Sequence, residues 1–260
     1  MTFQSTYVIG DIHGRLRLLD QLIKDIPWDP ARDRIIFLGD LIDRGQEAPG
    51  VVNRIMALKQ ANPNVVVLRG NHEQMLLDCL FAGDLQWLVP ENGGLETLRG
   101  YGIDPEGLEE LSDIKIPEAH IAFFKSLPYY YEDAQAIYVH AGLLPGVDVT
   151  DTPSEVLIWT RNPYFYIEYE GKTCYFGHTP TQLLPRAGRS RKFGIYIKGS
   201  CVGLDTSGEH DSPLSCLRTD SFTLYQAYPN GSTEVERLGH LKPGVEAKDV
   251  ETGKADLTSA

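Results

Sequence analysis

Five short motifs that combine glycine with aspartate, histidine or asparagine are spread along the sequence. They are Gly10-Asp11-Ile12-His13-Gly14, Gly39-Asp40-Leu41-Ile42-Asp43-Arg44-Gly45, Gly70-Asn71-His72-Glu73, His140-Ala141-Gly142 and Gly177-His178-Thr179. Carboxylate, amide and imidazole groups without thiolates suit manganese, iron or zinc rather than calcium. One such motif alone would more often be a helix cap or a hydrogen-bonded loop histidine. Five of them in order favour a metal site.

The motifs hold more candidate ligands than one metal ion needs. The candidates are Asp11, His13, Asp40, Asn71, His140 and His178. Two metal ions about 3.5 to 4 Å apart, bridged by one carboxylate, would use all of them, and such a pair catalyses in-line displacement at phosphorus. A water between the ions becomes a hydroxide nucleophile near neutral pH. We therefore predict two divalent cations, with manganese as the first choice and iron or zinc as alternatives.

Residues beside the candidate ligands suit a site that binds a phosphoryl group. Arg44 could bind phosphate oxygens with both arms of its guanidinium group, and His72 could protonate the leaving oxygen. Asp43 could keep His72 cationic, because an opposite charge within a few ångströms raises the pKa of a histidine. Asn71 could contact the phosphate as well as a metal. Arg161 is a candidate second phosphate-binding arginine, with a surface ion pair as the alternative.

Short β-branched and aromatic runs precede the motifs and are predicted to be buried strands. These runs are Tyr7–Ile9, Ile35–Leu38, Val65–Leu68, Ile137–Val139 and Cys174–Phe176. Between the first three runs, apolar residues recur at helical spacing. This order implies parallel strands with helices packed on the sheet. Because ligands bind at the carboxyl ends of such strands, the five motifs should converge.

The remaining segments predict the rest of the architecture. Strand-like runs stop over residues 83–133, where amphipathic segments such as Glu118–Ser126 predict a helical insertion that caps the site. Later short runs predict an antiparallel meander, at 193–197, 200–204, 215–217 and 222–226. We expect one α/β catalytic domain over residues 1–238, with two facing sheets and helices outside. Residues 239–260 are polar and are expected to form a mobile tail.

The composition is that of an ordinary globular protein. Of the 260 residues, 24 are Lys or Arg and 36 are Asp or Glu, so the net charge of −12 disfavours a nucleic-acid partner. The densest basic stretch, at 186–192, is interpreted as a solvated loop. No apolar run reaches the roughly 18 residues of a membrane helix, and residues 1–10 lack a signal-peptide layout. Four widely spaced cysteines fit reduced thiols. We expect a cytoplasmic protein without a membrane partner.

The five motifs together resemble the calcineurin-like metallophosphoesterase superfamily, over about Tyr7 to Thr206, and within it the phosphoprotein phosphatases of small bacterial and phage type. The resemblance implies a four-layer α/β/β/α sandwich of two facing mixed sheets with a dinuclear metal centre at the strand ends. It also implies that Asp11, His13 and bridging Asp40 bind the first metal, and that Asp40, Asn71, His140 and His178 bind the second. In the same way, His72 and Asp43 match the proton-donating pair, and Arg44 and Arg161 match the phosphate-binding arginines.

The details of the motifs favour one activity within this superfamily. Symmetrical diadenosine tetraphosphate hydrolases usually carry other residues at the positions of Asp43 and Glu73. The resemblance therefore implies a phosphatase for phosphoserine and phosphothreonine in proteins or peptides, acting by direct attack of metal-bound hydroxide, and it leaves open whether phosphotyrosine is also a substrate. Ser207 replaces the glycine usual in a late Leu-Asp-Thr-Gly segment, which affects a turn but no ligand. The alternatives are a nucleotide or diadenosine tetraphosphate hydrolase and a catalytically silent binding scaffold.

Overall fold

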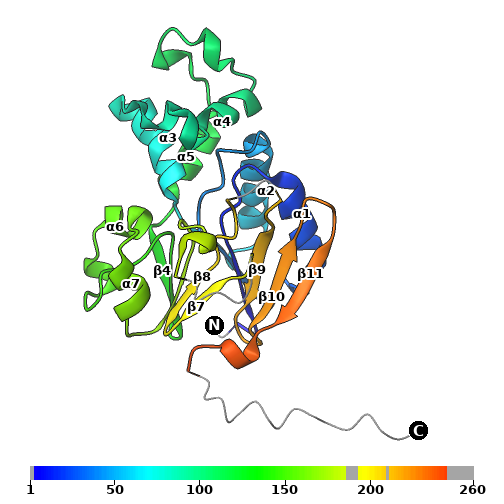
Figure 1. Ribbon diagram of the computed structural model, residues 1–260. Coiled ribbons are helices and arrows are strands. Elements are labelled where there is room, and N and C mark those ends of the chain that lie inside the picture. Colours follow the sequence, from blue (N-terminus) through cyan, green and yellow to red (C-terminus); the bar gives the residue numbers. More distant parts are fainter. Residues whose placement is uncertain (1–2, 186–192, 209–210, 245–260) are drawn as a thin grey trace, which may run out of the picture.

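The computed structural model describes residues 3–185, 193–208 and 211–244 and contains two mixed β-sheets (Figure 1). The first sheet has the strand order β11-β10-β9-β1-β2-β3 and the second has the order β4-β5-β6-β8-β7. The strands are β1 Thr6–Ile9, β2 Arg34–Phe37, β3 Val65–Val67, β4 Tyr130–Glu132, β5 Ala136–Val139, β6 Thr173–Phe176, β7 Tyr196–Lys198, β8 Cys201–Gly203, β9 Leu214–Arg218, β10 Thr223–Ala227 and β11 Thr233–Arg237. Strands β1, β2 and β3 are parallel, as are β5, β6 and β8. The predicted pair of mixed sheets is confirmed.

Helices cover the outer faces of the two sheets, which completes the predicted four-layer sandwich (Figure 1). The first sheet carries α1 Leu16–Asp25 and α2 Ala48–Ala61, and the second carries α6 Ser154–Trp159 and α7 Pro163–Glu168. Side chains alternate along β1: Tyr7 and Ile9 join the apolar cluster under the helices, and Val8 joins the cluster between the sheets. Because the central strands are buried on both faces, they read as continuous apolar runs in the sequence.

A lobe of helices lies above the carboxyl ends of β1, β2 and β3 (Figure 1). Its helices are α3 Asn71–Ala82, α4 Gly94–Gly100 and α5 Glu118–Ser126, with short 3-10 turns at Leu85–Leu88, Pro90–Asn92, Pro105–Gly107 and Leu111–Asp113. Leu76 of α3 and Phe124 of α5 are fully buried in the same apolar cluster as the helices of the first sheet. The lobe is therefore continuous with the core that supports the strand ends. Strand β4 lies at the end of this segment, where the sequence pattern predicted no strand.

The predicted antiparallel meander is divided between the two sheets. Strands β7 and β8 form a hairpin in the second sheet, and β8 pairs in parallel with β6. Strands β9, β10 and β11 form a true meander in the first sheet, where β9 pairs with β1. The chain thus crosses between the sheets after β8, and Asp205, which follows β8, lies close enough to raise the pKa of the predicted ligand Asp11.

Further 3-10 turns lie at Val149–Asp151, Thr181–Leu183 and Gly239–Leu241. The basic stretch at 186–192 and residues 245–260 of the predicted tail lie outside the described residues.

All four cysteines are buried and unpaired. Among the helices that the structure describes, none has the length and apolar character needed to cross a membrane.

Candidate metal centre

The carboxyl ends of five strands deliver the predicted ligands to one place. Loops after β1 and β2 carry Asp11, His13 and Asp40, and the first residue of α3 is Asn71. His140 directly follows β5. His178 lies two residues after the end of β6. All six side chains are buried, with at most 5% of their surface exposed. The structure therefore brings together every candidate ligand that the sequence predicted.

Asp40 lies at the centre of two groups of possible ligand atoms. One group is Asp40, His13 and His72, and the other is Asp40, His140 and His178; within each group the atoms lie within 4.8 Å of one another. The Asp40 Oδ2 atom is 3.7 Å from His13 Nε2, and Oδ1 is 3.3 Å from His140 Nε2. A carboxylate that faces both groups occupies the bridging position of a two-metal site.

The Asn71 amide completes the second group. Its Oδ1 atom lies 2.9 Å from His140 Nε2 and 2.8 Å from His178 Nδ1. Burial lowers the pKa of His140 and favours the neutral ring. The His140 Nδ1 atom lies 2.9 Å from the Leu38 carbonyl, so the single ring proton belongs there. His140 Nε2 then directs a lone pair at two oxygen acceptors.

Acceptor atoms that face one another repel unless a cation lies among them, and histidines that bind metals commonly donate their other N–H to a backbone carbonyl. The His13 ring is oriented in a similar way, because its Nδ1 lies 3.1 Å from the Ile42 carbonyl, while its Nε2 faces Asp40 and lies 2.8 Å from Arg44 Nη1. Asp11 Oδ1 is buried without a hydrogen-bond partner among the described residues. The residues present therefore fit a pair of divalent metal ions.

Electrostatics inside the cluster also favour added positive charge. Burial raises the pKa of Asp11 well above its usual value, and the carboxylates of Asp205 and Asp40 raise it further. Burial would also raise the pKa of Asp40, but the surrounding histidines outweigh burial and lower it. Asp11 thus lacks the neutralising partners that Asp40 has. A divalent cation beside Asp11 would supply that charge.

Backbone strain is concentrated at the same loops. Six non-glycine residues of the described chain have a positive φ angle, and five of them belong to the site. They are His13 at 49°, Asp40 at 51°, Asp43 at 70°, Arg44 at 65° and His178 at 64°. Such conformations are unfavourable for residues with a Cβ atom and persist where surrounding structure imposes them, often at functional sites.

Two glycines let backbone pass directly against the ligands. A Cβ atom at Gly177 would collide with Asp11 Oδ1, and one at Gly70 would collide with Asp40 Oδ1 and the Asp40 nitrogen. Both carboxylates are buried, so neither can move away into solvent. The glycines of the motifs therefore serve close approach to the metal ligands.

Gly177→Ala should lower metal affinity, because the new methyl group displaces Asp11. We expect a fall of about 10- to 100-fold, comparable to the loss of a group that orients a ligand. Titration of manganese into the apo protein by calorimetry measures the affinity. Gly107→Ala is the matched control, since a Cβ there meets only ordinary contacts. An unchanged affinity in Gly177→Ala would contradict the placement of Asp11.

The predicted proton donor His72 forms a buried pair with Asp43. His72 Nδ1 is 2.7 Å from Asp43 Oδ2, and the Asp43 side chain is fully buried. Burial alone would lower the pKa of His72, but the charges of Asp40 and Asp43 and the hydrogen bond to Asp43 raise it. The pair can hold a proton on the ring beside the ligand cluster, as general acid catalysis requires.

Trp87 and Thr97 hold Asp43 in place, and the sequence patterns did not indicate either. Trp87 Nε1 donates to both Asp43 oxygens at 3.0 and 3.1 Å, and Thr97 Oγ1 donates to Asp43 Oδ1 at 2.8 Å. Both come from the helical lobe, whose sequence shows no motif. A signal that could have pointed to Trp87 is the rarity of tryptophan, of which the sequence has three.

Trp87→Phe should reduce kcat about tenfold for a phosphate ester with a poor leaving group, because Asp43 loses two hydrogen bonds that orient it. KM should change little, since Trp87 acts through Asp43 and His72. Steady-state kinetics on phenyl phosphate measures both constants, with thermal unfolding as a check on folding. Trp28→Phe is the matched control. An equal loss of kcat on 4-nitrophenyl phosphate, which needs less proton donation, would refute this positioning role.

Glu73 also has a positioning role, which its place in the Gly-Asn-His-Glu motif did not indicate. Its carboxylate accepts hydrogen bonds from the backbone nitrogens of Gly70 at 2.8 Å, Leu41 at 2.8 Å and Asp40 at 3.1 Å. Burial and the neighbouring Asp40 raise the pKa of Glu73 to about 7. This side chain joins the loops after β2 and β3 and so fixes the bridging carboxylate.

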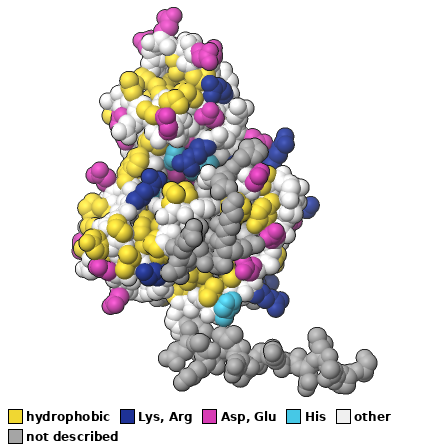
Figure 2. All heavy atoms as spheres, viewed as in Figure 1, with side chains coloured by type: hydrophobic (Ala, Val, Ile, Leu, Met, Phe, Trp, Pro, Cys, Tyr) yellow, Lys and Arg dark blue, Asp and Glu magenta, His cyan; other side chains and the backbone are white. Residues whose placement is uncertain are grey.

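The two predicted phosphate-binding arginines lie at the exposed edge of the cluster. Arg44 Nη1 is 2.8 Å from His13 Nε2, and Arg161 Nη2 donates to the His178 carbonyl over 3.4 Å. Both residues are exposed. Figure 2 shows blue and cyan side chains at the junction between the helical lobe and the sandwich. Both arginines can therefore reach a phosphate from the solvent side.

Comparison with known families agrees with this geometry. The model of the calcineurin-like phosphoesterase family matches residues 5–182, more than half of the chain. The chain belongs to the calcineurin-like phosphoesterase family. A dinuclear metal centre is a feature of this family, in agreement with two ligand groups that share Asp40.

Curated relatives of this phosphoesterase include enzymes named bis(5'-nucleosyl)-tetraphosphatase, symmetrical. The protein from Coxiella burnetii is 29% identical over 182 residues, which cover 69% of this chain and 56% of that protein. The protein from Dechloromonas aromatica is 30% identical over 141 residues, which cover 54% of this chain and 45% of that protein. The chain therefore spans about half the length of these relatives.

Solved structures share the fold of this phosphoesterase. A putative diadenosine tetraphosphatase has a TM-score of 0.60 at 19% identity, with 90% of this chain and 93% of that chain covered. A cold-active protein tyrosine phosphatase of a psychrophilic Shewanella species has a TM-score of 0.57 at 17% identity, with 90% of this chain and 80% of that chain covered. At these identities the likeness concerns the fold alone.

Proposed function

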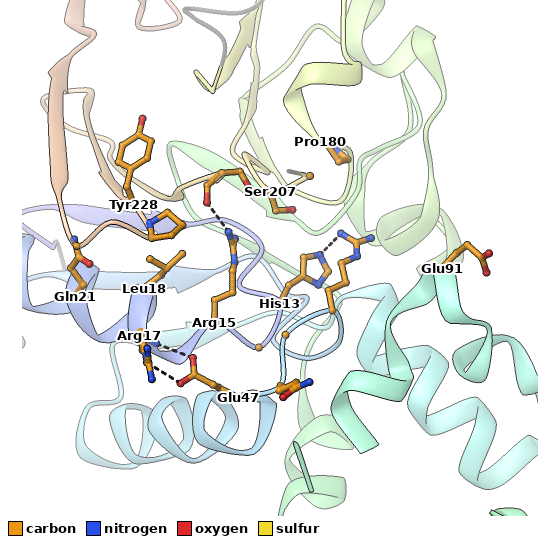
Figure 3. Close-up of a pocket in the computed structure, with 18 residues that line it drawn as sticks. His13, Arg15, Arg17, Leu18, Gln21, Glu47, Glu91, Pro180, Ser207 and Tyr228 are labelled. Atoms are coloured by element: carbon orange, nitrogen blue, oxygen red, sulfur yellow. Dashed lines mark hydrogen bonds and ion pairs between the residues drawn. The ribbon is translucent and has the colours of Figure 1, made fainter. Parts of the chain in front are cut away.

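We propose that this phosphoesterase hydrolyses dinucleoside polyphosphates, with diadenosine tetraphosphate as the test substrate and manganese as the metal. The observation that carries the proposal is a cavity of about 900 Å³ that opens at His13 and Arg44 and continues to Tyr228 (Figure 3). Sites of this volume enclose ligands far larger than a phosphate group. The names of the curated relatives support the same substrate class.

Different residues of the chain would bind the metal ions, bind the phosphate groups and donate a proton in this reaction. The six ligands Asp11, His13, Asp40, Asn71, His140 and His178 would hold two divalent ions, which supply an activated water and neutralise charge on the phosphate. Arg44 and Arg161 lie where they can bind phosphate oxygens and orient the chain of phosphates. His72 holds a proton beside the cluster for the leaving oxygen.

Product analysis tests this proposal. Diadenosine tetraphosphate is incubated with the manganese-loaded protein, and the products are separated by anion-exchange chromatography. Symmetrical cleavage gives ADP alone, and in water enriched in ¹⁸O one of the two ADP molecules carries the label. Formation of AMP and ATP would contradict symmetrical cleavage. Recovery of intact substrate at high enzyme concentration would exclude the proposed function.

A phosphoprotein phosphatase is the second candidate, and the His72–Asp43 pair favours it. A serine alkoxide is a far worse leaving group than a nucleoside diphosphate and so needs a general acid. The buried pair, in which His72 Nδ1 lies 2.7 Å from Asp43 Oδ2, can supply that proton. The Asp-Arg-Gly and Gly-Asn-His-Glu sequences also support this candidate, which was the first prediction from the sequence. Release of phosphate from a phosphoserine peptide at a higher kcat/KM than from the dinucleotide would establish it.

A further inference from the structure

The cavity beside the metal ligands has two chemically different ends (Figure 3). His13 and Arg44 form the near end, where a phosphate would lie. Leu18 of α1 and Tyr228 and Pro229 of the turn between β10 and β11 form the far end. Leu18 is buried and Tyr228 is half-buried. The far end therefore offers an aromatic ring and aliphatic surface, which suit an uncharged flat group.

Arg15 lines the middle of the cavity and joins two loops there. The Arg15 guanidinium group donates to three backbone carbonyls, those of Asp11 at 3.0 Å, Ile12 at 2.8 Å and Ser212 at 3.1 Å. Three of its five N–H groups thus join the loops after β1 and β8 and hold Arg15 as a fixed floor of the cavity. Arg44 at the near end contacts the ligand His13 directly and is the arginine that we assign to the phosphate.

The wall at the far end is held in place before any ligand binds. Gln21 Nε2 of α1 donates to the Ser232 carbonyl at 2.7 Å and to Thr233 Oγ1 at 2.8 Å, and Thr233 Oγ1 donates to Asp25 at 2.6 Å. Within the turn, the Tyr228 nitrogen donates to the Ser232 carbonyl at 2.9 Å. Because helix and turn are joined in this way, Tyr228 and Leu18 keep their separation, and binding there needs little reorganisation.

We propose that the far end of this cavity, formed by Tyr228, Pro229 and Leu18, is a subsite for the nucleobase of a substrate whose phosphate lies at Arg44. The proposal rests on the proposed function, because a nucleobase enters the site only on a nucleotide. Stacking on an aromatic ring is the common way in which proteins bind bases, and it tolerates different bases. The subsite therefore selects for a nucleotide over a phosphate ester without a base.

The test compares two competitors that differ only by a nucleobase. Inhibition constants of AMP and ribose 5-phosphate are measured on the manganese-loaded protein with 4-nitrophenyl phosphate as the reporter substrate. Binding of AMP is also followed directly by NMR saturation transfer to the adenine protons. Tyr228→Ala should weaken AMP about tenfold, as expected for loss of one stacked base, and change the constant of ribose 5-phosphate less than twofold. Tyr228→Phe keeps the ring and should bind AMP as the wild type does.

Tyr164→Ala is the matched control, since this tyrosine is 59% exposed on α7 and does not line the cavity. Equal AMP binding in wild type and Tyr228→Ala overturns the subsite, as does equal weakening of AMP and ribose 5-phosphate. The proposed function can fail separately. If the protein leaves diadenosine tetraphosphate intact but loses AMP affinity in Tyr228→Ala, the subsite stands and the proposed reaction does not.

Discussion

Replacing Asp40 by asparagine should lower turnover on every phosphate ester by more than about 100-fold, because Asp40 faces both groups of metal ligands. Changes that only disturb the orientation of a metal ligand already cost 10- to 100-fold. Loss of the bridging carboxylate removes a ligand and a negative charge from both positions. Chelation of the wild-type protein should give the same loss, and added manganese should restore the wild type but not Asp40→Asn.

The measurement is kcat on 4-nitrophenyl phosphate together with metal content per chain by mass spectrometry. Asp20→Asn is the matched control, because the Asp20 side chain is half exposed and pairs with Arg54 at the surface. We expect about two metal ions in wild type and Asp20→Asn, and fewer in Asp40→Asn. Full activity of Asp40→Asn, or of fully chelated wild type, would show that the cluster is not the catalytic centre.

Replacing His72 by asparagine should have an effect that depends on the leaving group. Proton donation contributes about 10²- to 10⁴-fold when the leaving oxygen is strongly basic. We therefore expect a loss in this range on phenyl phosphate and on phosphoserine peptides. On 4-nitrophenyl phosphate and diadenosine tetraphosphate, whose leaving groups are stable anions, the loss should stay within about tenfold. Comparison of kcat across these substrates measures the dependence.

His240→Asn serves as control for this series, because His240 lies on the exposed surface outside the centre. A uniform loss across all leaving groups would mean that His72 acts as a metal ligand rather than as a proton donor. The geometry makes this alternative specific, because His72 Nε2 lies 3.7 Å from Asp40 Oδ2. Metal content of His72→Asn distinguishes the two roles.

The convergence of the ligands was predictable because each one follows a strand. Asp11, Asp40 and Asn71 come after three parallel strands of one sheet, and His140 and His178 come after two parallel strands of the other. Parallel strands end at the same edge, so the position along the chain determines the position in space. The polar residues that follow the apolar runs therefore predict the site from the sequence alone.

The supporting contacts were not predictable in the same way. Trp87 and Thr97 reach Asp43 from the helical lobe, 44 and 54 residues further along the chain. No periodicity in a sequence specifies such a contact, because it depends on how the lobe packs over the strand ends. Tyr228 and Leu18 are a similar case, since they line the same cavity only because α1 packs on the meander.

Strand assignment failed where burial is weak. Strand β11 has exposed or half-buried residues throughout, and β4 is a three-residue edge strand with no fully buried side chain. Hydrophobic patterning detects strands that are covered on at least one face and has little to detect at an open edge. The division of the meander between two sheets was not predictable, because the short apolar runs of β8 and β9 have the same pattern although they belong to different sheets.

We propose that this metal centre serves nucleotides rather than phosphorylated proteins. A side-by-side determination of kcat/KM on diadenosine tetraphosphate, a phosphoserine peptide and a phosphotyrosine peptide, each with manganese and with a chelated control, tests this choice. We expect the highest kcat/KM on the dinucleotide and no turnover in the chelated samples. A clear preference for either peptide would contradict it and would establish the phosphoprotein phosphatase.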